Sequence, residues 1–248
     1  MSEPLTFWEH LDVLRGNIIR SLFVVMAAAV VAFMLKDWLF AVVLAPRTSD
    51  FISYQLLGID EPFSIHLMNT GLTEQFMTHI RVALYAGLLI ASPYVLYQLF
   101  CFVSPGLYQN ERKAATWIVT SAYVMFIMGT LINYLLIFPL TVRFLGTYQV
   151  SDDVENMLTL QSYIDTLIGM SFMMGVVFEL PVVCAILGKM GLINNGLMTK
   201  YRRQAVVVIL IVSAIITPTT DAFTLIIVAL PIWLLYEVSI GIVKLNKN

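Results

Sequence analysis

A single carboxylate with two bases directly behind it stands in a short polar loop between two long apolar runs. The loop, residues 104–113, carries Glu111, Arg112 and Lys113. A fixed anion at the edge of a membrane can hold a cationic group, while neighbouring apolar surface holds a hydrophobic one. That combination suits a basic segment followed by a hydrophobic helix, which is the form of a signal peptide.

The composition excludes an ordinary soluble protein. The 248 residues are 59% hydrophobic and 12% charged, with a mean hydropathy of +0.85, whereas a soluble domain is about half apolar and a quarter charged. We therefore expect an all-α integral membrane protein, formed as a single polytopic membrane domain over residues 1–248.

Six apolar runs are predicted to be membrane helices. Their approximate bounds are 18–44, 76–103, 114–140, 163–188, 204–217 and 222–243. About 20 helical residues cross a hydrocarbon core of roughly 30 Å, so the fifth run, with 14 residues, is too short to cross fully. We predict six transmembrane helices, bent at prolines around a concave face, with a short final hairpin.

The basic residues determine the predicted orientation. With the N-terminus inside, ten of the fourteen Lys and Arg residues fall on the cytoplasmic side, as the positive-inside rule requires. An even number of spans then places the C-terminus on the same side. Both termini are therefore expected in the cytoplasm.

One carboxylate lies well inside a predicted span. Glu179 stands in the segment Phe178-Glu179-Leu180-Pro181, and a charge within a membrane is costly and usually faces a cavity or a partner. Two interpretations stay open. Glu179 is either protonated or hydrogen-bonded and ties helices together, or it is exposed in a membrane cavity, where it faces a ligand or couples to partner helices.

The sequence lacks the motifs that several kinds of binding or catalytic site require. The histidines His10, His66 and His79 show no ligand spacing, so no metal site is predicted. The chain has no glycine-rich phosphate loop, no Gly-x-Ser-x-Gly motif and no Ser/His pair typical of an intramembrane protease. We expect no cofactor, no enzymatic activity and no nucleic-acid partner.

A series of short motifs resembles the TatC family, the multispanning core subunit of twin-arginine protein translocases. In chain order the motifs are His10-Leu11-Asp12-Val13-Leu14-Arg15, Ala45-Pro46, Ala91-Ser92-Pro93, Phe102-Val103-Ser104-Pro105-Gly106-Leu107-Tyr108 with Glu111-Arg112, Phe138-Pro139-Leu140, Phe178-Glu179-Leu180-Pro181, and Thr217-Pro218 with Asp221. Each motif is weak by itself. Their order and spacing over essentially the whole chain make the resemblance specific.

The resemblance implies a twin-arginine signal-peptide receptor at the core of a Sec-independent translocase in the inner membrane. Such proteins export folded precursors, are driven by the proton-motive force without ATP, and work with TatA/TatB-type single-span subunits. Self-association in a larger complex and contact with membrane lipid are also expected. The expected signal-peptide binding residues are Glu111, Glu9, Asp12, Arg15 and Phe102, and the expected membrane-cavity or partner-coupling residues are Glu179, Pro46 and Asp221.

One departure from the family pattern removes an expected anion. The pattern before the first span is His-Leu-x-Glu-Leu-Arg, and Val13 occupies its Glu position here. Asp12 is adjacent, and Glu9 lies four residues back, on the same face if the segment is helical. Either carboxylate is a candidate substitute, so Glu111 is expected to carry more of the arginine recognition.

A second class of function remains open from the residues alone. A small-molecule or ion transporter would use the intramembrane Glu179 as its site. Co-purification with single-span helical partners and a precursor favours the translocase, whereas uptake by the purified chain alone favours the transporter.

Overall fold

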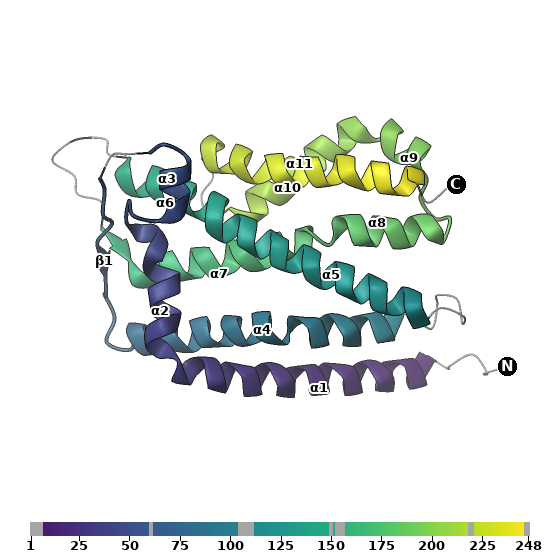
Figure 1. The fold of residues 1–248 in the computed structure, drawn as a ribbon, viewed down its shortest axis with the longest axis horizontal. Helices are drawn as coiled ribbons and strands as arrows, with labels where there is room; N and C mark the ends of the chain where they lie inside the picture. Colours follow the sequence, from purple (N-terminus) through teal and green to yellow (C-terminus); the bar gives the residue numbers. More distant parts are fainter. Residues whose placement is uncertain are drawn as a thin grey trace. The chain divides into compact units, whose positions relative to one another are not determined.

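The structure is a computed structural model. Most of the residues that it describes are helical (Figure 1). The described residues are 7–59, 62–103, 112–148, 151, 157–217 and 221–245. Within them the only strands are two of two residues each, β1 Leu67–Met68 and β2 Leu158–Thr159. The all-α prediction is therefore confirmed.

The helices follow the apolar runs, and three of the runs are interrupted. The helices are α1 Phe7–Met34, α2 Lys36–Leu44, α3 Ile52–Leu56, α4 Glu74–Val103, α5 Arg112–Ile132, α6 Phe138–Thr147, α7 Leu160–Val177, α8 Leu180–Lys189, α9 Asn195–Lys200, α10 Arg202–Ile216 and α11 Ala222–Leu245. A 3₁₀ turn, Ala45–Arg47, follows α2. A π-helical segment, Asn133–Ile137, joins α5 to α6.

Five helical stretches of the described chain are long and apolar enough to cross a membrane. They are Leu11–Met34, Glu74–Phe102, Trp117–Thr147, Leu160–Lys189 and Ala222–Leu245. By contrast, α10 has 15 residues, about 22 Å of helix against a core of roughly 30 Å. The short fifth run is thus a short helix, as predicted, while the count of six spans stays a prediction.

Large apolar side chains of α1 are exposed on the surface of the protein. Phe23, in the middle of α1, is 72% exposed, and Val30 is 60% exposed. A soluble protein does not leave such a stripe in water. Lipid around α1 would remove this surface from water, which agrees with a membrane protein.

Contacts divide the chain into two compact units. Unit 1 comprises Met1–Lys36 and His79–Val124, and unit 2 comprises Asp37–Thr78 and Met125–Asn248. The predicted concave face depends on the arrangement of the two units and stays a prediction.

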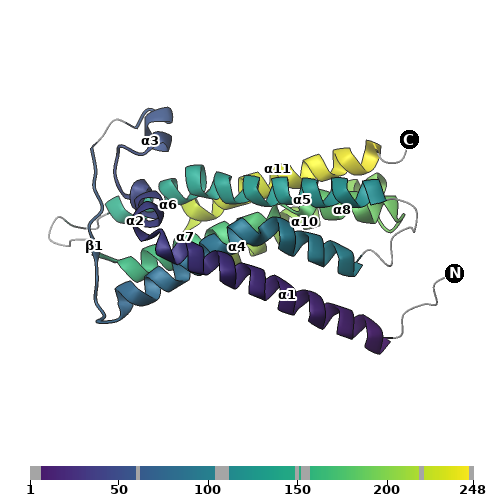
Figure 2. The ribbon, with the colours of Figure 1, turned by 60° about the horizontal axis from the view of Figure 1, so that its bottom comes forward.

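In unit 1, α1 and α4 pack against each other in opposite directions (Figures 1 and 2). A Cβ atom added to Gly87 of α4 would lie 2.6 Å from the backbone nitrogen of Ala29 in α1, so only glycine permits this approach. Further along, the side-chain amide of Asn17 donates to the carbonyl oxygen of Gln98 at 3.4 Å. The two helices are therefore antiparallel.

In unit 2, α5 crosses α7 through two reciprocal glycine contacts. A Cβ atom on Gly129 of α5 would lie 2.6 Å from the carbonyl oxygen of Met174 and 2.8 Å from the side chain of Phe178. A Cβ atom on Gly175 of α7 would lie 2.7 Å from the ring of Phe126. Each helix thus supplies a glycine that accommodates a phenylalanine of the other.

The core of unit 2 is apolar and contains an inter-helical hydrogen bond. It joins α7, α10, α11 and the π-helical segment through the buried side chains Ile137, Met170, Met174, Phe178, Ile209, Ile216, Val228, Ile232 and Leu235. Within it the side-chain amide of Asn133 donates to the hydroxyl of Ser171 at 2.8 Å. Such a bond satisfies polar groups that lipid could not.

Tyr54 of α3 holds the connection after α2 in place. Its side chain is fully buried, and its hydroxyl lies 2.9 Å from the carbonyl oxygens of both Pro46 and Pro139. The single hydroxyl proton is donated to one of these oxygens at a time. Burial raises the pKa of Tyr54 above its usual range, against a smaller lowering by Arg143, so the hydroxyl stays a donor.

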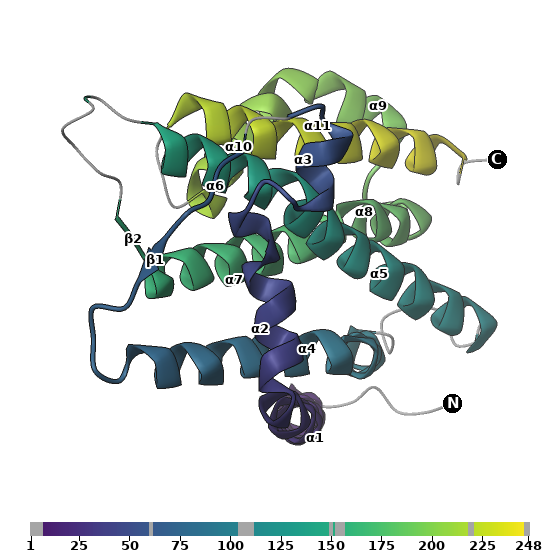
Figure 3. The ribbon, with the colours of Figure 1, turned by 60° about the vertical axis from the view of Figure 1, so that its left-hand side comes forward.

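Glu74 joins two connections that are far apart in sequence. Its Oε2 accepts hydrogen bonds from the nitrogen and hydroxyl of Thr70 and from the nitrogen of Gly71, at 2.8–3.0 Å. Its Oε1 accepts from the nitrogen of Gln161 in α7 at 3.0 Å. Beside this carboxylate β1 and β2 pair in parallel, where α7 begins (Figure 3).

Replacing Gly129 with alanine should destabilise the protein, because the added methyl group meets the backbone of α7 rather than a side chain that can turn away. Overpacking of this kind costs about 1–3 kcal/mol. Gly169→Ala on α7 is the matched control, since a Cβ atom there has nothing within 4 Å. Thermal unfolding of the purified protein in detergent should show a lower midpoint for Gly129→Ala only, and equal midpoints would contradict the close crossing.

The Tyr54→Phe variant should loosen the connection between α2 and α4, because one proline carbonyl loses its donor without any change in packing volume. The expected loss of stability is about 1–3 kcal/mol, the cost of a buried polar group left unpaired. Hydrogen exchange over residues 45–57 should accelerate. The control is Tyr123→Phe, at an exposed tyrosine of α5, which should leave this exchange unchanged. Unchanged exchange in Tyr54→Phe would show that the hydroxyl has no role.

Candidate functional site

The N-terminal candidates lie in the first turns of α1. The helix begins at Phe7, so Glu9 and Val13 are one turn apart on the same face. The side chains of Asp12, Val13 and Arg15 are exposed. The expected helical spacing between Glu9 and Val13 is therefore present.

The pairing of α1 with α4 brings a second candidate to the same end of unit 1. Asn17 contacts Gln98, and because the helices run in opposite directions, Phe102 in the last turn of α4 lies about level with Asp12 and Val13. Phe102 is half-buried. Figure 2 shows the start of α1 and the end of α4 on the same side of the unit.

Glu111 lies outside the described residues, so the structure gives no account of its side chain. The chain leaves α4 after Val103 and enters α5 at Arg112. The loop that contains Glu111 is thus attached to the end of α4 that carries Phe102.

Glu179 occupies the break between α7 and α8. Its backbone nitrogen donates to the carbonyl oxygen of Val176, and its carbonyl oxygen accepts from the nitrogen of Val183. Pro181 stands in the first turn of α8, where its missing N–H costs no hydrogen bond. The predicted span of residues 163–188 is therefore two helices with Glu179 at their junction.

The side chain of Glu179 is half-buried, and its Oε1 has no hydrogen-bond partner within the described part of the chain. A carboxyl oxygen that is buried among apolar helices without a partner is costly. Water, a ligand or a partner helix would remove this cost. The described residues of the chain therefore leave Oε1 of Glu179 without a hydrogen-bond partner.

The other two candidates in unit 2 have local structural contacts. Pro46 is buried in the 3₁₀ turn, and its carbonyl oxygen is one of the two acceptors of the Tyr54 hydroxyl. Oδ1 of Asp221 accepts from the backbone nitrogen of Thr224 at 2.7 Å, so this side chain caps the start of α11. Glu179, Pro46 and Asp221 lie on separate elements.

Sequence reasoning missed two residues that organise unit 2. Glu74 had one available signal, because an acid just before a long apolar run is favourable in the first turn of a helix. Nothing in the sequence marks Gln161 as its partner. Tyr54 carried no signal, because its acceptors are carbonyl groups, which every residue has.

The described residues show no metal centre. Among them, no group of three or more His, Cys, Asp or Glu side chains is placed to hold a metal ion. The chemistry they do offer is carboxylate pairing with cations at the end of unit 1, and one unpaired carboxyl oxygen in unit 2.

Comparison with known proteins shows similarity along nearly the whole chain. The family model described as Sec-independent protein translocase protein (TatC) matches residues 9–231. The TatC protein of Carboxydothermus hydrogenoformans is 32% identical, over 99% of this chain and 95% of its own length. The TatC protein of Aquifex aeolicus is 30% identical, over 98% of this chain and 95% of its own length.

Solved structures agree with these relatives. The crystal structure of the twin-arginine translocase receptor TatC superposes with a TM-score of 0.79 at 29% identity, covering 96% of this chain and 100% of the other. A second crystal structure of that receptor, in DDM, gives a TM-score of 0.79 at 28% identity. The sequence and the fold thus agree over nearly the whole chain, and the chain belongs to the TatC family of Sec-independent protein translocase proteins.

Proposed function

We propose that this chain is the receptor for twin-arginine signal peptides and the core of a Sec-independent translocase that exports folded proteins across the inner membrane. The TatC crystal structure that it resembles is named as a receptor. The observation that carries the proposal is the packing of α1 on α4, which brings Asp12 and Arg15 to the end of unit 1 where Phe102 lies and from which the chain continues toward Glu111.

Recognition of a pair of arginines requires carboxylates. The guanidinium group presents a planar fork that binds a carboxylate through two parallel hydrogen bonds, whereas an ammonium group cannot. Glu111 is the main anion in this proposal. Glu9 or Asp12 supplies a weaker second anion, because Val13 cannot accept a hydrogen bond.

The apolar part of the signal peptide would lie beside Phe102, while Arg15 would help to balance the local charge of the acids. Asp12 and Arg15 are three residues apart in α1, so they are neighbours on the helix surface. Each charge-assisted hydrogen bond at such a partly wet site is worth about 1.5–3 kcal/mol.

The remaining elements of the proposal follow from the charge distribution and the family. Both termini lie in the cytoplasm, on the side that holds ten of the fourteen bases. The chain acts as one polytopic domain with six spans, associates with TatA/TatB-type single-span subunits and with further copies of itself, and is driven by the proton-motive force.

Glu179 is proposed to couple the chain to partner helices, with Pro46 and Asp221 holding the adjoining segments of unit 2. The support is the unpartnered Oε1 at the break between α7 and α8. The same observation is the one feature that favours the alternative, a small-molecule or ion transporter with Glu179 as its site.

The Glu111→Gln variant should bind a twin-arginine peptide roughly 10- to 100-fold more weakly, because the substitution removes the charge and keeps the shape. Glu9→Gln and Asp12→Asn alone should each cost less. Val13→Glu should partly rescue Glu111→Gln if both sites address the same two arginines. Peptide affinity measured for these variants in detergent decides the matter, with a twin-lysine peptide as the matched ligand control.

If Glu111→Gln binds the twin-arginine peptide as well as the unmodified protein does, the recognition model is wrong.

The Glu179→Ala variant should fold and bind precursor normally, yet transport it poorly, because the carboxyl group is unpaired by the described chain and acts on a partner. Export of a folded reporter and precursor binding should be measured on the same membranes, with Glu179→Gln as the charge-free isostere. Normal export by both variants would contradict the coupling role. Uptake of a small solute by the purified chain alone, abolished in Glu179→Ala, would support the transporter instead.

A further inference from the structure

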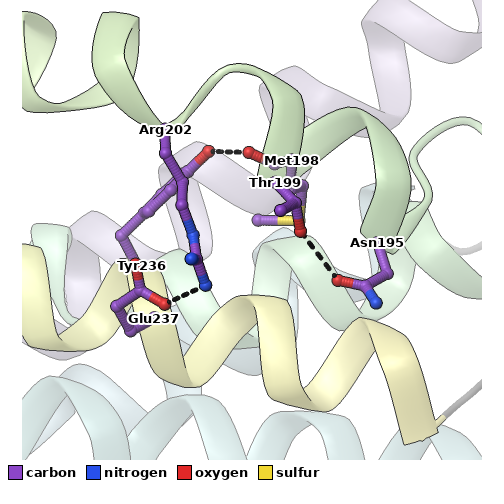
Figure 4. A network of polar contacts seen from close by, with 6 residues as sticks. All are labelled: Asn195, Met198, Thr199, Arg202, Tyr236 and Glu237. Carbon is purple, nitrogen blue, oxygen red and sulfur yellow. Dashed lines mark hydrogen bonds and ion pairs between the residues drawn. The ribbon is translucent and has the colours of Figure 1, made fainter.

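The short helix α9 is held firmly on α11 at one end of unit 2. Met198 is buried against Ile240 and Val243 of α11. The hydroxyl of Tyr236 donates to the carbonyl oxygen of Met198 at 2.9 Å (Figure 4). Oδ1 of Asn194 accepts from the nitrogen of Leu197 and caps the helix. The face of α9 turned away from α11 is therefore presented on a fixed support.

Basic side chains collect around this support. A Cβ atom on Gly188 would lie 3.3 Å from Cγ2 of Val243, so the end of α8 lies beside the end of α11 and close to α9. The exposed bases at this end are Lys189, Lys200, Arg202, Arg203 and Lys244. They come from four different helices that the fold brings to one place.

Acidic side chains do not balance these bases. Within residues 180–245 the acids are Asp221, which caps the opposite end of α11, and Glu237. Glu237 is already paired, since its Oε2 lies 2.7 Å from the guanidinium group of Arg202 (Figure 4). Five bases and one nearby acid leave a local charge of about +4.

Large apolar side chains are exposed among the same bases. Leu192 is 63% exposed, Leu197 is 44% exposed and Tyr201 is 46% exposed. The ammonium group of Lys200 lies over the ring of Tyr201, 5.8 Å from its centroid. Bases mixed with Leu and Tyr at the ends of apolar helices are typical of the boundary between headgroups and acyl chains.

We propose that this surface, defined by Lys189, Leu192, Leu197, Lys200, Tyr201 and Arg203 and called the α9 platform, binds the headgroups of anionic phospholipids. The charge selects an anionic partner, and the exposed leucines select one that also offers acyl chains. An acidic soluble segment would pair with the bases but would leave the leucines in water. The proposal needs only that α11 and the stretch Leu160–Lys189, which ends with α8, cross the membrane, whichever side this end faces.

A bound lipid layer would also position α10. This helix is about 22 Å long, and it leaves the α9 platform at Arg202. With that end held at the headgroups, the other end, at Thr217, remains inside the bilayer. The α9 platform thus gives a physical reason for a short helix to keep a constant depth.

The test uses native mass spectrometry of the purified full chain in detergent, titrated with phosphatidylglycerol, cardiolipin or phosphatidylcholine. Anionic lipids should bind in preference to phosphatidylcholine. Lys200→Gln with Arg203→Gln should weaken anionic-lipid binding about tenfold or more, because each base near a membrane surface contributes to the attraction. The charge-retaining pair Lys200→Arg with Arg203→Lys should bind normally.

The matched control is Lys36→Gln with Arg47→Gln, which removes two exposed bases elsewhere and should bind anionic lipid normally. Equal binding of phosphatidylcholine, or unchanged binding by the Lys200→Gln and Arg203→Gln pair, would overturn the proposal. So would glycerol phosphate competing as well as the intact lipid does, which would indicate a simple phosphate site. Displacement of lipid by an acidic peptide at equal concentration would point to a protein partner instead.

Discussion

Inside the apolar helices a polar group needs a partner other than lipid, because lipid tails offer none. Buried hydroxyls meet this requirement by donating to the carbonyl four residues back in their own helix, as in Thr141, Ser213 and Ser239. The amide of Asn133 meets it across helices by donating to Ser171. This requirement explains why helices interrupted by irregular backbone still hold together.

Two of the three interruptions lie next to a proline. Pro139 has no N–H to donate, and the π-helical segment Asn133–Ile137 precedes it. Pro181 follows the break at Glu179 in the same way. The first break places Asn133 at the inter-helical bond, and the second places a carboxyl group within a membrane-crossing stretch. At these two breaks, irregular backbone and a polar side chain within the apolar region therefore occur together.

Close packing depends on small residues at defined points. Gly87, Gly129 and Gly175 each lie where an added Cβ atom would meet another helix at 2.7 Å or less. Without a hydrophobic force between helices in lipid, such contacts supply much of the association energy. The same lack of a force explains why α1 can keep a broad exposed apolar surface.

The composition and the apolar runs were sufficient to predict an all-α membrane protein and a short helix near residues 204–217. They did not predict that the third and fourth runs would be divided, because the length and hydropathy of a run say nothing about its internal breaks. The candidate site followed partly from motifs. Asp12 and Phe102 were both named from sequence, but their nearness follows from the packing of α1 on α4.

The sequence by itself determined which segments are apolar, where the charges stand and which family the motifs resemble, because these properties belong to residues in order along the chain. Only the tertiary structure decided the partners of Glu74 and Tyr54, which lie up to 87 residues away. It also decided that bases from four helices surround α9. Such contacts depend on how helices pack, and backbone groups that serve as partners leave no mark in a sequence.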